Sequence, residues 1–327
     1  MLIFVSRTNI RIFRKLKKGI VIKSTGSRYT VRDEEGIMLD CIIAGKFRMK
    51  GLKTTNPVAV GDIVTIKPGE SGQHHTITEI EQRKNYIIRR SSNLSHQYHI
   101  IASNIDQALL IITIGFPDTT TAFIDRFLVS AEAYRIPVVL IFNKADMYDN
   151  ELGEEIKNLI SIYENIGYQC LQTSARTGTG IDELKKILTD KVSVIAGHSG
   201  VGKSTLVNKI SPGLNLKTGK ISDYHLKGKH TTTFAEMFEL ETGGFIIDTP
   251  GIKGFGVIDM EKEEIFHFFP EIFRVAENCQ YYNCTHIHEP GCAVKEAVDK
   301  EEISYSRYYN YVGLVTNSED KYRNKDY

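Results

Sequence analysis

The segment from 197 to 204 reads G-H-S-G-V-G-K-S, and it constrains the fold of this 327-residue chain more than any other feature. An apolar run at 192–195, expected to be a strand, precedes it, and residues 204–208, expected to be a helix, follow it. In that setting the pattern G-x-x-x-x-G-K-[ST] is a phosphate-binding loop, because its glycines let backbone amides and the helix N-terminus face phosphate groups. A chance glycine-rich turn is the alternative.

The loop predicts specific nucleotide contacts. Lys203 is expected to bridge the β- and γ-phosphates, and the Ser204 hydroxyl is expected to ligate Mg²⁺. The full set of expected nucleotide-contacting residues in this segment is Gly197, His198, Ser199, Gly200, Val201, Gly202, Lys203, Ser204 and Thr205.

A second motif addresses the base. Asn143-Lys144-Ala145-Asp146 ends the apolar run 138–142, so it falls at the end of a buried strand, where open α/β sheets place ligands. A carboxylate at Asp146 can accept from two adjacent N–H groups of guanine, whereas adenine has no such donor pair. A helix cap is the alternative for the motif alone. Ser174 and Ala175, at the next expected strand end, would add backbone amides near the guanine carbonyl.

Two more motifs follow the phosphate loop. Asp248-Thr249-Pro250-Gly251 ends the apolar run 245–247, which suits Asp248 to the Mg²⁺ shell and the Gly251 amide to sensing the γ-phosphate. His230-Thr231-Thr232-Thr233 lies between the loop and that strand. Thr232 or Thr233 is expected to complete the Mg²⁺ shell, and the sequence does not separate the two. An ordinary polar loop is the alternative.

The order of these motifs is unusual, because the base motif precedes the phosphate loop that it normally follows. All of them are expected on loops at one end of a parallel sheet, so the site depends on which strands are neighbours. Cutting one surface loop and joining the old termini leaves such a site intact. The sequence therefore predicts a circularly permuted α/β domain whose γ-phosphate-sensing segment leads into a C-terminal region from about residue 255.

A cysteine cluster lies in that C-terminal region. Cys279, Cys284, His286 and Cys292 form C-x₄-C-x-H-x₅-C, and three thiolates with one imidazole make a closed, tetrahedral, structural Zn²⁺ site. His288 also lies inside this segment, but it is expected to be a spare histidine that does not ligate the metal. An odd count of five cysteines, three of them clustered, favours a reducing compartment and a metal over disulfides. Cys41 and Cys170 are expected in the core, and helices are expected at 261–268 and 293–298.

The N-terminal part reads as short strands separated by turn signals. The expected strands are 20–23, 29–32, 37–43, 63–67 and 76–81. Five strands in so short a stretch suit a small barrel of the OB type, a fold that commonly binds nucleic acid. An SH3-like interaction barrel is the alternative. The segment 46–53 interleaves basic and apolar residues, as phosphate contact requires.

Charge is divided unevenly along the chain. Residues 1–98 carry 18 Lys+Arg and 8 Asp+Glu, a net +10, whereas the remainder carries 23 and 32, a net −9. This asymmetry predicts a polyanionic partner for the N-terminal part, with a solvated basic face as the alternative. A basic, polar linker follows the barrel and contains Arg83, Lys84 and residues 89–93. It is expected either to add RNA contacts or simply to span two domains. Residues 1–32 contain no acidic residue. The alternatives for this segment are an organelle-targeting leader, a disordered basic arm and an upstream start-codon artefact.

No apolar run approaches the roughly 20 residues of a membrane span, and the first five residues are too short for a signal-peptide core. A soluble, cytoplasmic protein without a membrane partner is therefore expected.

The motif order, the His-Thr-Thr-Thr segment and the flanking regions resemble the RsgA (YjeQ) family of circularly permuted GTPases, over residues from about 18 to 315. The resemblance implies a mostly parallel P-loop GTPase domain between an OB-type barrel and a small helical zinc domain. The expected division is a basic extension at 1–17, the barrel at 18–84, the GTPase domain at 85–254 with a linker at 85–103, and the zinc domain at 255–327. Lys229 stands where arginine is common in the family.

The resemblance also implies an activity: a monomer that hydrolyses GTP to GDP and phosphate, and that binds the small (30S) ribosomal subunit and its rRNA late in assembly. Ile252 stands where Ras-like GTPases carry a water-orienting glutamine, so slow intrinsic turnover is expected. The family points to His230 as the residue that orients water once the subunit is bound. A nucleotide-gated RNA-binding scaffold with incidental hydrolysis is one alternative, and a permuted GTPase with a tRNA or membrane partner is another.

Overall fold

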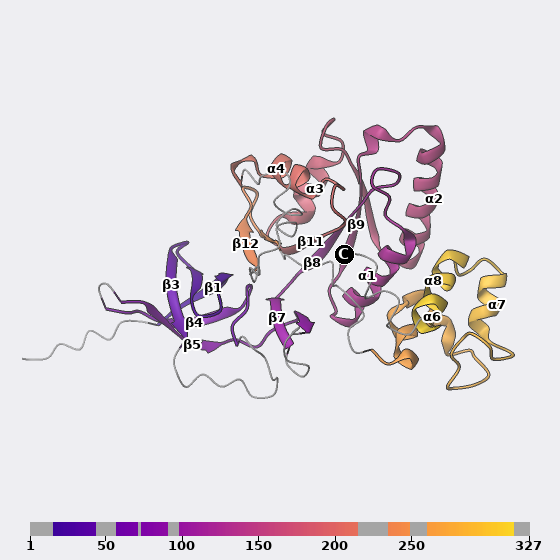
Figure 1. Ribbon diagram of the computed structural model, residues 1–327, viewed down its shortest axis with the longest axis horizontal. Coiled ribbons are helices and arrows are strands. Elements are labelled where there is room, and N and C mark those ends of the chain that lie inside the picture. The colour runs from indigo at the N-terminus through magenta and orange to yellow at the C-terminus, as the bar shows by residue number, and fades with distance from the viewer. Residues whose placement is uncertain are drawn as a thin grey trace, which may run out of the picture.

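A mostly parallel sheet forms the centre of the molecule (Figure 1). The computed structural model describes residues 16–43, 57–70, 73–90, 98–214, 235–248 and 260–316. The central strands, in spatial order, are β10 (Gln169–Thr173), β9 (Val138–Asn143), β8 (Gln107–Ile112), β11 (Val192–Ala196), β13 (Phe245–Asp248) and β12 (Glu236–Glu239). The first five pair in parallel, and β12 runs antiparallel to β13.

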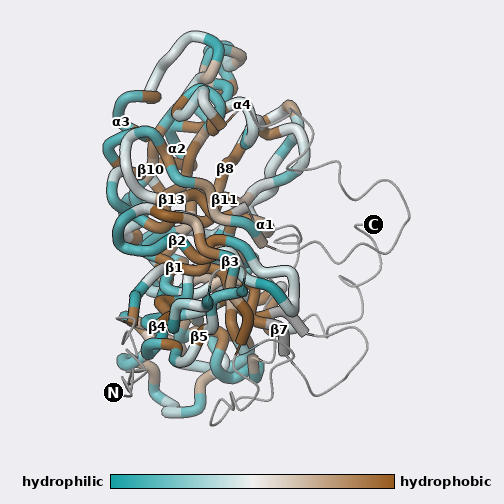
Figure 2. Tube along the Cα trace, turned by 90° about the vertical axis from the view of Figure 1, so that its left-hand side faces the viewer, coloured by the Kyte–Doolittle hydropathy of each residue, from teal (hydrophilic) through white to brown (hydrophobic). Residues whose placement is uncertain are grey.

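Helices cover both faces of this sheet. One face carries α1 (Thr121–Ala133) and α2 (Asn150–Ile166), and the other carries α3 (Ile181–Leu188) and α4 (Lys203–Ile210). Both faces are covered, so β8 and β9 are buried along their whole length and are apolar except for Gln107 and Asn143. Figure 2 shows the resulting hydrophobic colour along β8 and β11.

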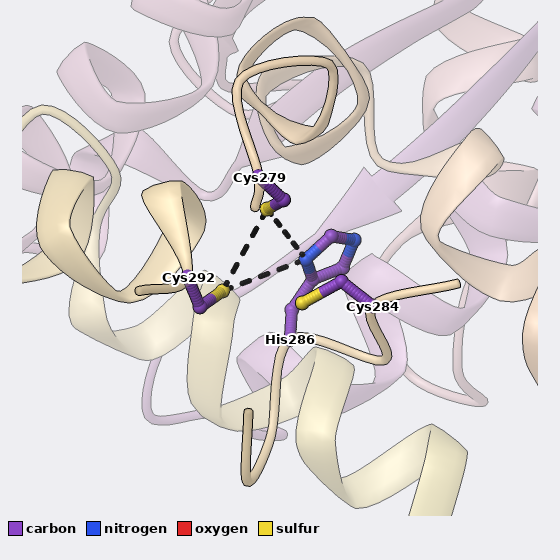
Figure 3. A group of neighbouring side chains, drawn as sticks. All are labelled: Cys279, Cys284, His286 and Cys292. Carbon is purple, nitrogen blue, oxygen red and sulfur yellow. Dashed lines mark hydrogen bonds between the residues drawn. The ribbon is translucent and has the colours of Figure 1, made fainter. Parts of the chain in front are cut away.

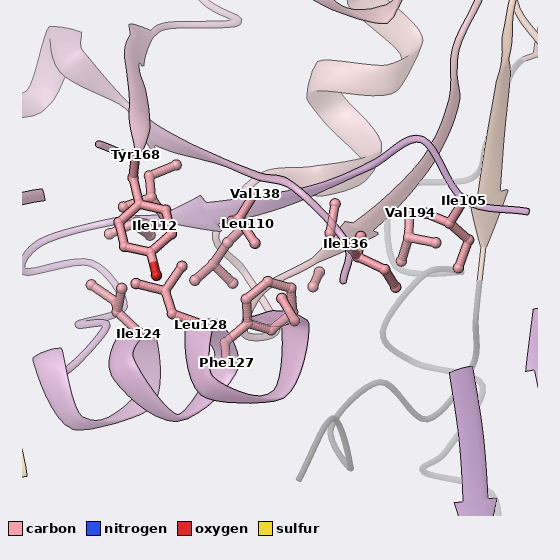
Figure 4. Close-up of a cluster of buried hydrophobic side chains, with 14 of the residues drawn as sticks. Ile105, Leu110, Ile112, Ile124, Phe127, Leu128, Ile136, Val138, Tyr168 and Val194 are labelled. Carbon is pink, nitrogen blue, oxygen red and sulfur yellow. The ribbon is translucent and has the colours of Figure 1, made fainter. Parts of the chain in front are cut away.

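The two faces of β8 illustrate how this core is divided. Leu110 and Ile112 belong to the cluster under α1 and α2, whereas Leu109 and Ile111 belong to the cluster under α3 and α4. In Figure 4, Leu110 and Ile112 lie above Phe127 of α1. The core thus fixes α1 against the sheet at its centre.

The N-terminal strands close into a barrel. They are β1 (Lys17–Ser24), β2 (Tyr29–Asp33), β3 (Met38–Ile43), β4 (Ile63–Lys67) and β5 (His75–Ile80). The order is β1-β2-β3-β5-β4, β4 pairs back onto β1, and only the β3–β5 pair is parallel among these pairings. The expected five-stranded barrel is confirmed, with strand ends that differ from the predicted ones by at most three residues.

The barrel is continuous with the central sheet. β1 pairs antiparallel with β12 at Lys23 and Glu236, and the two side chains form an ion pair at 2.9 Å. Arg32 Nη2 of β2 lies 2.8 Å from Glu239 Oε1, also on β12. The N-terminal module therefore contacts the strand that precedes β13, a junction that the sequence did not predict.

Residues 85–103 are not a plain polar linker. They contain β6 (Tyr86–Arg90) and β7 (Tyr98–Ser103), which pair antiparallel. Ile87 and Ala102 are buried in the same cluster as the central sheet, and Ile101 packs against it. Alternating apolar residues in this segment supply that buried face, and they were overlooked beside its basic residues.

Arg83, expected either to contact RNA or to span two domains, has a side chain that is only 8% exposed and lies between the barrel and β7. Its Nε and Nη2 each lie 2.6 Å from the carboxylate of Asp62, and Ser103 Oγ donates to the same carboxylate at 2.6 Å. This buried ion pair joins the barrel to β7.

The C-terminal region is helical. It comprises the 3₁₀ helix η4 (Lys262–Phe268), α6 (Pro270–Ala276), α7 (Ala293–Asp299) and α8 (Tyr305–Thr316). Helices were expected at 261–268 and 293–298; the first is 3₁₀ and ends before Pro270, which forces Phe269 into an extended conformation. Its core includes Val129 of α1, so this region packs directly on the central domain. Two short 3₁₀ turns, η1 (Ala145–Met147) and η2 (Pro212–Leu214), are also present in the described residues.

None of the helices in the described ranges combines the length and the apolar character that crossing a bilayer requires.

Candidate functional site

The glycine-rich segment forms a tight loop between β11 and α4. Gly197, Gly200 and Gly202 have φ of 137°, 84° and 100°, a region that side-chain-bearing residues rarely adopt. A Cβ atom on Gly197 would lie 2.4 Å from the Ile111 carbonyl oxygen of β8. The loop therefore needs glycine both for its backbone shape and for its close approach to the neighbouring strand.

Lys203, the first residue of α4, folds back over this loop. Its Nζ donates to the carbonyl oxygens of Gly197 at 2.7 Å and His198 at 2.6 Å, and the residue is only 9% exposed. Ser204 is equally buried beside it, and Thr205 is exposed on the first turn of the helix. The ammonium group is thus held inside the loop, at the N-terminus of a helix, where an anion is favoured.

Asn143, at the end of β9, joins three elements. Its Nδ2 donates to the Val201 carbonyl oxygen at 2.8 Å, and its Oδ1 accepts from Thr173 Oγ1 of β10 at 3.0 Å. The side chain is buried, so both of its polar atoms are used within the protein. Asn143 therefore fastens the phosphate loop to the strand ends that carry the base motif.

The neighbouring Lys144 adopts a left-handed conformation with φ of 66°, and its Nζ donates to the Phe116 carbonyl oxygen at 2.6 Å. Phe116 lies in the segment that connects β8 to α1. In the same region, the ring of Phe123 on α1 lies 4.0 Å, centroid to centroid, from the ring of His198. The sequence reasoning missed this segment, although Gly115 and Pro117 break the chain at the same end of the sheet as the other motifs.

Asp146 has both carboxylate oxygens engaged. Ser174 Oγ donates to Oδ1, and Arg176 Nε donates to Oδ2 at 2.6 Å. The hydrogen bond from Ser174, and then the bond from Arg176, lower the pKa of Asp146, although desolvation acts in the opposite direction. The group is therefore a carboxylate at neutral pH. Ala175 is half-buried beside it, and Arg176 was not among the predicted residues.

The remaining predicted residues are only partly described. Asp248 ends β13, which pairs in parallel with β11, so its backbone lies on the strand adjacent to the one that feeds the loop. His230, Thr232, Thr233 and Gly251 lie outside the described residues.

The cysteine cluster is assembled as predicted. The ligand atoms of Cys279, Cys284, His286 and Cys292 all lie within 4.8 Å of one another (Figure 3). His286 Nδ1 is 3.5 Å from Cys279 Sγ and 3.6 Å from Cys292 Sγ. Burial raises the pKa of the Cys284 thiol to about 12 and lowers that of His286, which keeps the imidazole neutral and able to ligate. Three thiols and one imidazole at this spacing fit a closed, four-coordinate metal site.

Hydrogen bonds shape the loop around these four residues. The Glu289 carboxylate accepts from the Thr285 hydroxyl at 2.7 Å and from the Thr285 and Ile287 amides at 2.8 and 3.1 Å. Tyr308 of α8 donates to the His286 carbonyl oxygen at 2.8 Å. His288, expected to be a spare, is exposed and is not part of the cluster.

Comparison with known proteins places the whole arrangement in a family. The RsgA GTPase family model matches residues 80–258, and the RsgA N-terminal domain model matches residues 18–74. The chain belongs to the RsgA GTPase family. The Small ribosomal subunit biogenesis GTPase RsgA 2 of Bacteroides thetaiotaomicron is 58% identical over 307 residues, which are 94% of this chain and 99% of that protein. RsgA of Flavobacterium psychrophilum is 55% identical over 311 residues, covering 94% of this chain and 95% of that protein.

Two solved structures extend this comparison. YjeQ from Thermotoga maritima superposes with a TM-score of 0.76 and 38% identity, covering 92% of this chain and 98% of that one. YloQ, described as a circularly permuted GTPase, superposes with a TM-score of 0.73 and 30% identity, covering 98% of this chain and 100% of that one. The predicted family, fold class and circular permutation are confirmed.

Proposed function

We propose that this RsgA-family protein hydrolyses GTP to GDP and phosphate and acts in the biogenesis of the small ribosomal subunit. The observation that carries this conclusion is the hydrogen bond from Asn143 to the Val201 carbonyl oxygen. It joins a phosphate-binding loop to a guanine-selective motif that precedes it in the chain. The names of the relatives, small ribosomal subunit biogenesis GTPases, supply the cellular process.

The nucleotide would lie across the carboxyl ends of β11, β9 and β10. In this proposal the backbone amides of 197–202 and the N-terminus of α4 bind the phosphates, and Lys203 turns from its carbonyl partners to the β- and γ-phosphates. The Asp146 carboxylate accepts from the guanine edge, with Ser174 and Ala175 beside it. Asn143 and Lys144 hold this arrangement together from within the protein.

Two metals are part of the proposal. Mg²⁺, which GTPases use to neutralise phosphate charge, would be held by Ser204 and by Thr232 or Thr233, with Asp248 near it. Zn²⁺ would be held by Cys279, Cys284, His286 and Cys292, a donor set that suits a structural site and leaves no open position for chemistry. Its role would be to stabilise the C-terminal helices.

Hydrolysis requires a residue that orients water. The position after Gly251 is Ile252, whose side chain cannot do so, and we propose His230 for this role. Binding to the small subunit would bring His230 and the Mg²⁺ threonine into place. A supplied catalytic group of this kind is worth roughly 10³- to 10⁵-fold in rate in other GTPases.

The proposed rRNA contacts lie mainly on segments next to the barrel strands. Within the described part of 16–90 there are 10 Lys+Arg and 8 Asp+Glu, and at least seven of those cations form ion pairs. By sequence, 1–15 and 44–56 each add four cations and no acid. We therefore assign the RNA-binding charge to these two segments, above all to Lys46, Arg48, Lys50 and Lys53.

GTP hydrolysis measured with and without purified small ribosomal subunits tests the function, with ATP as the control nucleotide. Strong stimulation by subunits, and no ATP turnover, is the expected result. Turnover that does not respond to subunits would favour the alternative, an RNA-binding scaffold whose hydrolysis is incidental.

The role of His230 needs a separate measurement. His230→Ala is expected to abolish most of the subunit-stimulated rate while GDP affinity stays unchanged. A variant that keeps the wild-type rate at saturating subunits would show that another residue orients the water.

A further inference from the structure

The carboxylate proposed to select guanine is occupied by the protein itself. Arg176 Nε lies 2.6 Å from Asp146 Oδ2, and Arg176 Nη2 reaches the Asp146 carbonyl oxygen at 3.5 Å. Ser174 Oγ donates to the other carboxylate oxygen. The Asp146 side chain is 9% exposed whereas that of Arg176 is 75% exposed, so arginine is the partner that is free to leave.

The turn that carries Arg176 is held by its own hydrogen bonds. The Ser174 amide donates to the Thr179 carbonyl oxygen at 3.0 Å, and the Gly178 amide donates to the Ser174 carbonyl oxygen at 2.9 Å. The Thr177 amide donates to Ser174 Oγ at 3.1 Å. These bonds do not involve the arginine side chain, so it can swing away from Asp146 while the backbone of the turn stays in place.

Arginine and guanine present the same chemistry to a carboxylate. The edge of guanine that distinguishes it from adenine is a ring N–H beside an amino group, both attached to one carbon, which is a guanidine unit. The arginine guanidinium offers N–H donors in the same planar arrangement. Arg176 Nε therefore occupies a carboxylate oxygen, Oδ2, that the guanine edge would also need as an acceptor.

We propose that Arg176 is an internal competitor of guanine, which holds Asp146 in the nucleotide-free protein and must leave when a guanine nucleotide binds. This inference rests on the proposed function of Asp146 in base selection. In the free protein, Arg176 is either paired with Asp146 or turned away from it. Competition multiplies the apparent dissociation constant for the nucleotide by one plus the ratio of the paired to the unpaired population. Because the Arg176 side chain is exposed to solvent, which weakens its pairing with Asp146, this factor is about two to five.

The competition also gives the site a defined resting state. Without Arg176, the nearly buried Asp146 carboxylate would lose the donor to Oδ2 and keep the Ser174 hydroxyl as its side-chain donor. The arginine replaces the missing donors of the base and keeps the carboxylate ionised and oriented. Its cost is weaker nucleotide binding, because the base can bind only after the arginine has left Asp146.

The affinity of full-length protein for fluorescent GDP tests the proposal. Arg176→Ala is expected to lower the dissociation constant about two- to fivefold through faster association, and the gain should shrink at high salt because the ion pair is screened. Arg176→Lys, which keeps the charge, is expected to stay close to wild type. Arg135→Ala is the matched control, because it removes an exposed arginine at the end of α1, outside the site.

Two outcomes would overturn the proposal. An unchanged dissociation constant in Arg176→Ala would mean that the ion pair does not compete with guanine. An increased constant would mean that Arg176 supports the bound base. The ¹⁵N resonance of Arg176 Nε gives an independent readout, because its hydrogen bond should be lost when GDP is added. If the wild-type protein binds ADP as well as GDP, the proposed function itself fails, whatever the arginine variants do.

Discussion

Arg307 of α8 donates from Nη1 to Asp125 Oδ1 of α1 at 2.7 Å, and the two side chains are 1% and 0% exposed. The same guanidinium donates to Glu271 of α6 at 2.6 and 3.1 Å. Burial alone would lower the pKa of Arg307, but the facing carboxyl groups outweigh it and raise the pKa. A single buried cation thus ties the helices around the cysteine cluster to a helix of the central domain.

Arg307→Ala is expected to destabilise the protein by about 3 to 5 kcal/mol, because it leaves Asp125 and Glu271 buried without their cation. Urea denaturation followed by circular dichroism measures this loss. Lys300→Ala is the matched control: it removes the exposed pair between Lys300 and Glu296, which contributes at most about 0.5 kcal/mol. Equal effects of the two substitutions would show that the buried network does not hold the regions together.

Gly197→Ala tests whether the phosphate loop requires glycine for space as well as for its backbone angle. A methyl group there would press on the Ile111 carbonyl oxygen of β8, which cannot move without breaking the sheet. GDP affinity is expected to fall more than about tenfold, the equivalent of 1.4 kcal/mol, by isothermal titration calorimetry.

Gly167→Ala is the control for the backbone term. Gly167 has a similar φ of 117°, but a Cβ atom there would meet nothing within 4 Å. Gly167→Ala should therefore lower the free energy of unfolding by about 1 to 2 kcal/mol and leave GDP affinity unchanged. If it weakens GDP binding as much as Gly197→Ala does, the effect is global and the steric argument is wrong.

Metal binding to the cysteine cluster should release protons. Burial raises the pKa of the Cys284 thiol to about 12 and also raises that of Cys292, so both are protonated at neutral pH in the metal-free fold. Zinc binds thiolates, so at least these two protons must leave, and the apparent affinity should rise by at least about a hundredfold per pH unit near neutrality. Calorimetric Zn²⁺ titrations in buffers of different ionisation enthalpy count the protons. His288→Ala should change neither quantity, and a titration without proton release would exclude thiolate ligation.

Local patterns predicted much of this structure. The strand before Gly197, the helix after it, and the apolar run before Asn143 have periodicities and flanking residues that determine secondary structure on their own. The four clustered metal ligands were predicted because short spacing forces them together whatever the surrounding fold. The shared end of the sheet also followed from sequence, because parallel strands that end in polar motifs must present them at one edge.

Contacts between distant segments were not predictable in the same way. Arg83 and Arg307 look like ordinary surface cations in the sequence, and only the fold shows that each is buried against a carboxylate far along the chain. The hydrogen bond from the Asn143 amide to the phosphate loop likewise joins positions 143 and 201, which no local pattern relates. The sequence did not predict a role for Arg176, because that role depends on the orientation of its side chain toward Asp146.

The junction between Lys23 of β1 and Glu236 of β12 gives a last prediction, because it links the barrel to the strand that pairs with β13. Lys23→Glu places like charges directly across the pair, which should speed hydrogen exchange of the β1 and β12 amides and lower subunit-stimulated GTP hydrolysis. The double exchange Lys23→Glu with Glu236→Lys should restore both. Lys67→Glu, the same charge change on exposed β4, is the control and should leave β12 exchange unchanged. If the double exchange fails to restore exchange protection, the ion pair does not fasten the barrel to the central sheet, and the two remaining partners, Arg32 and Glu239, would have to do so.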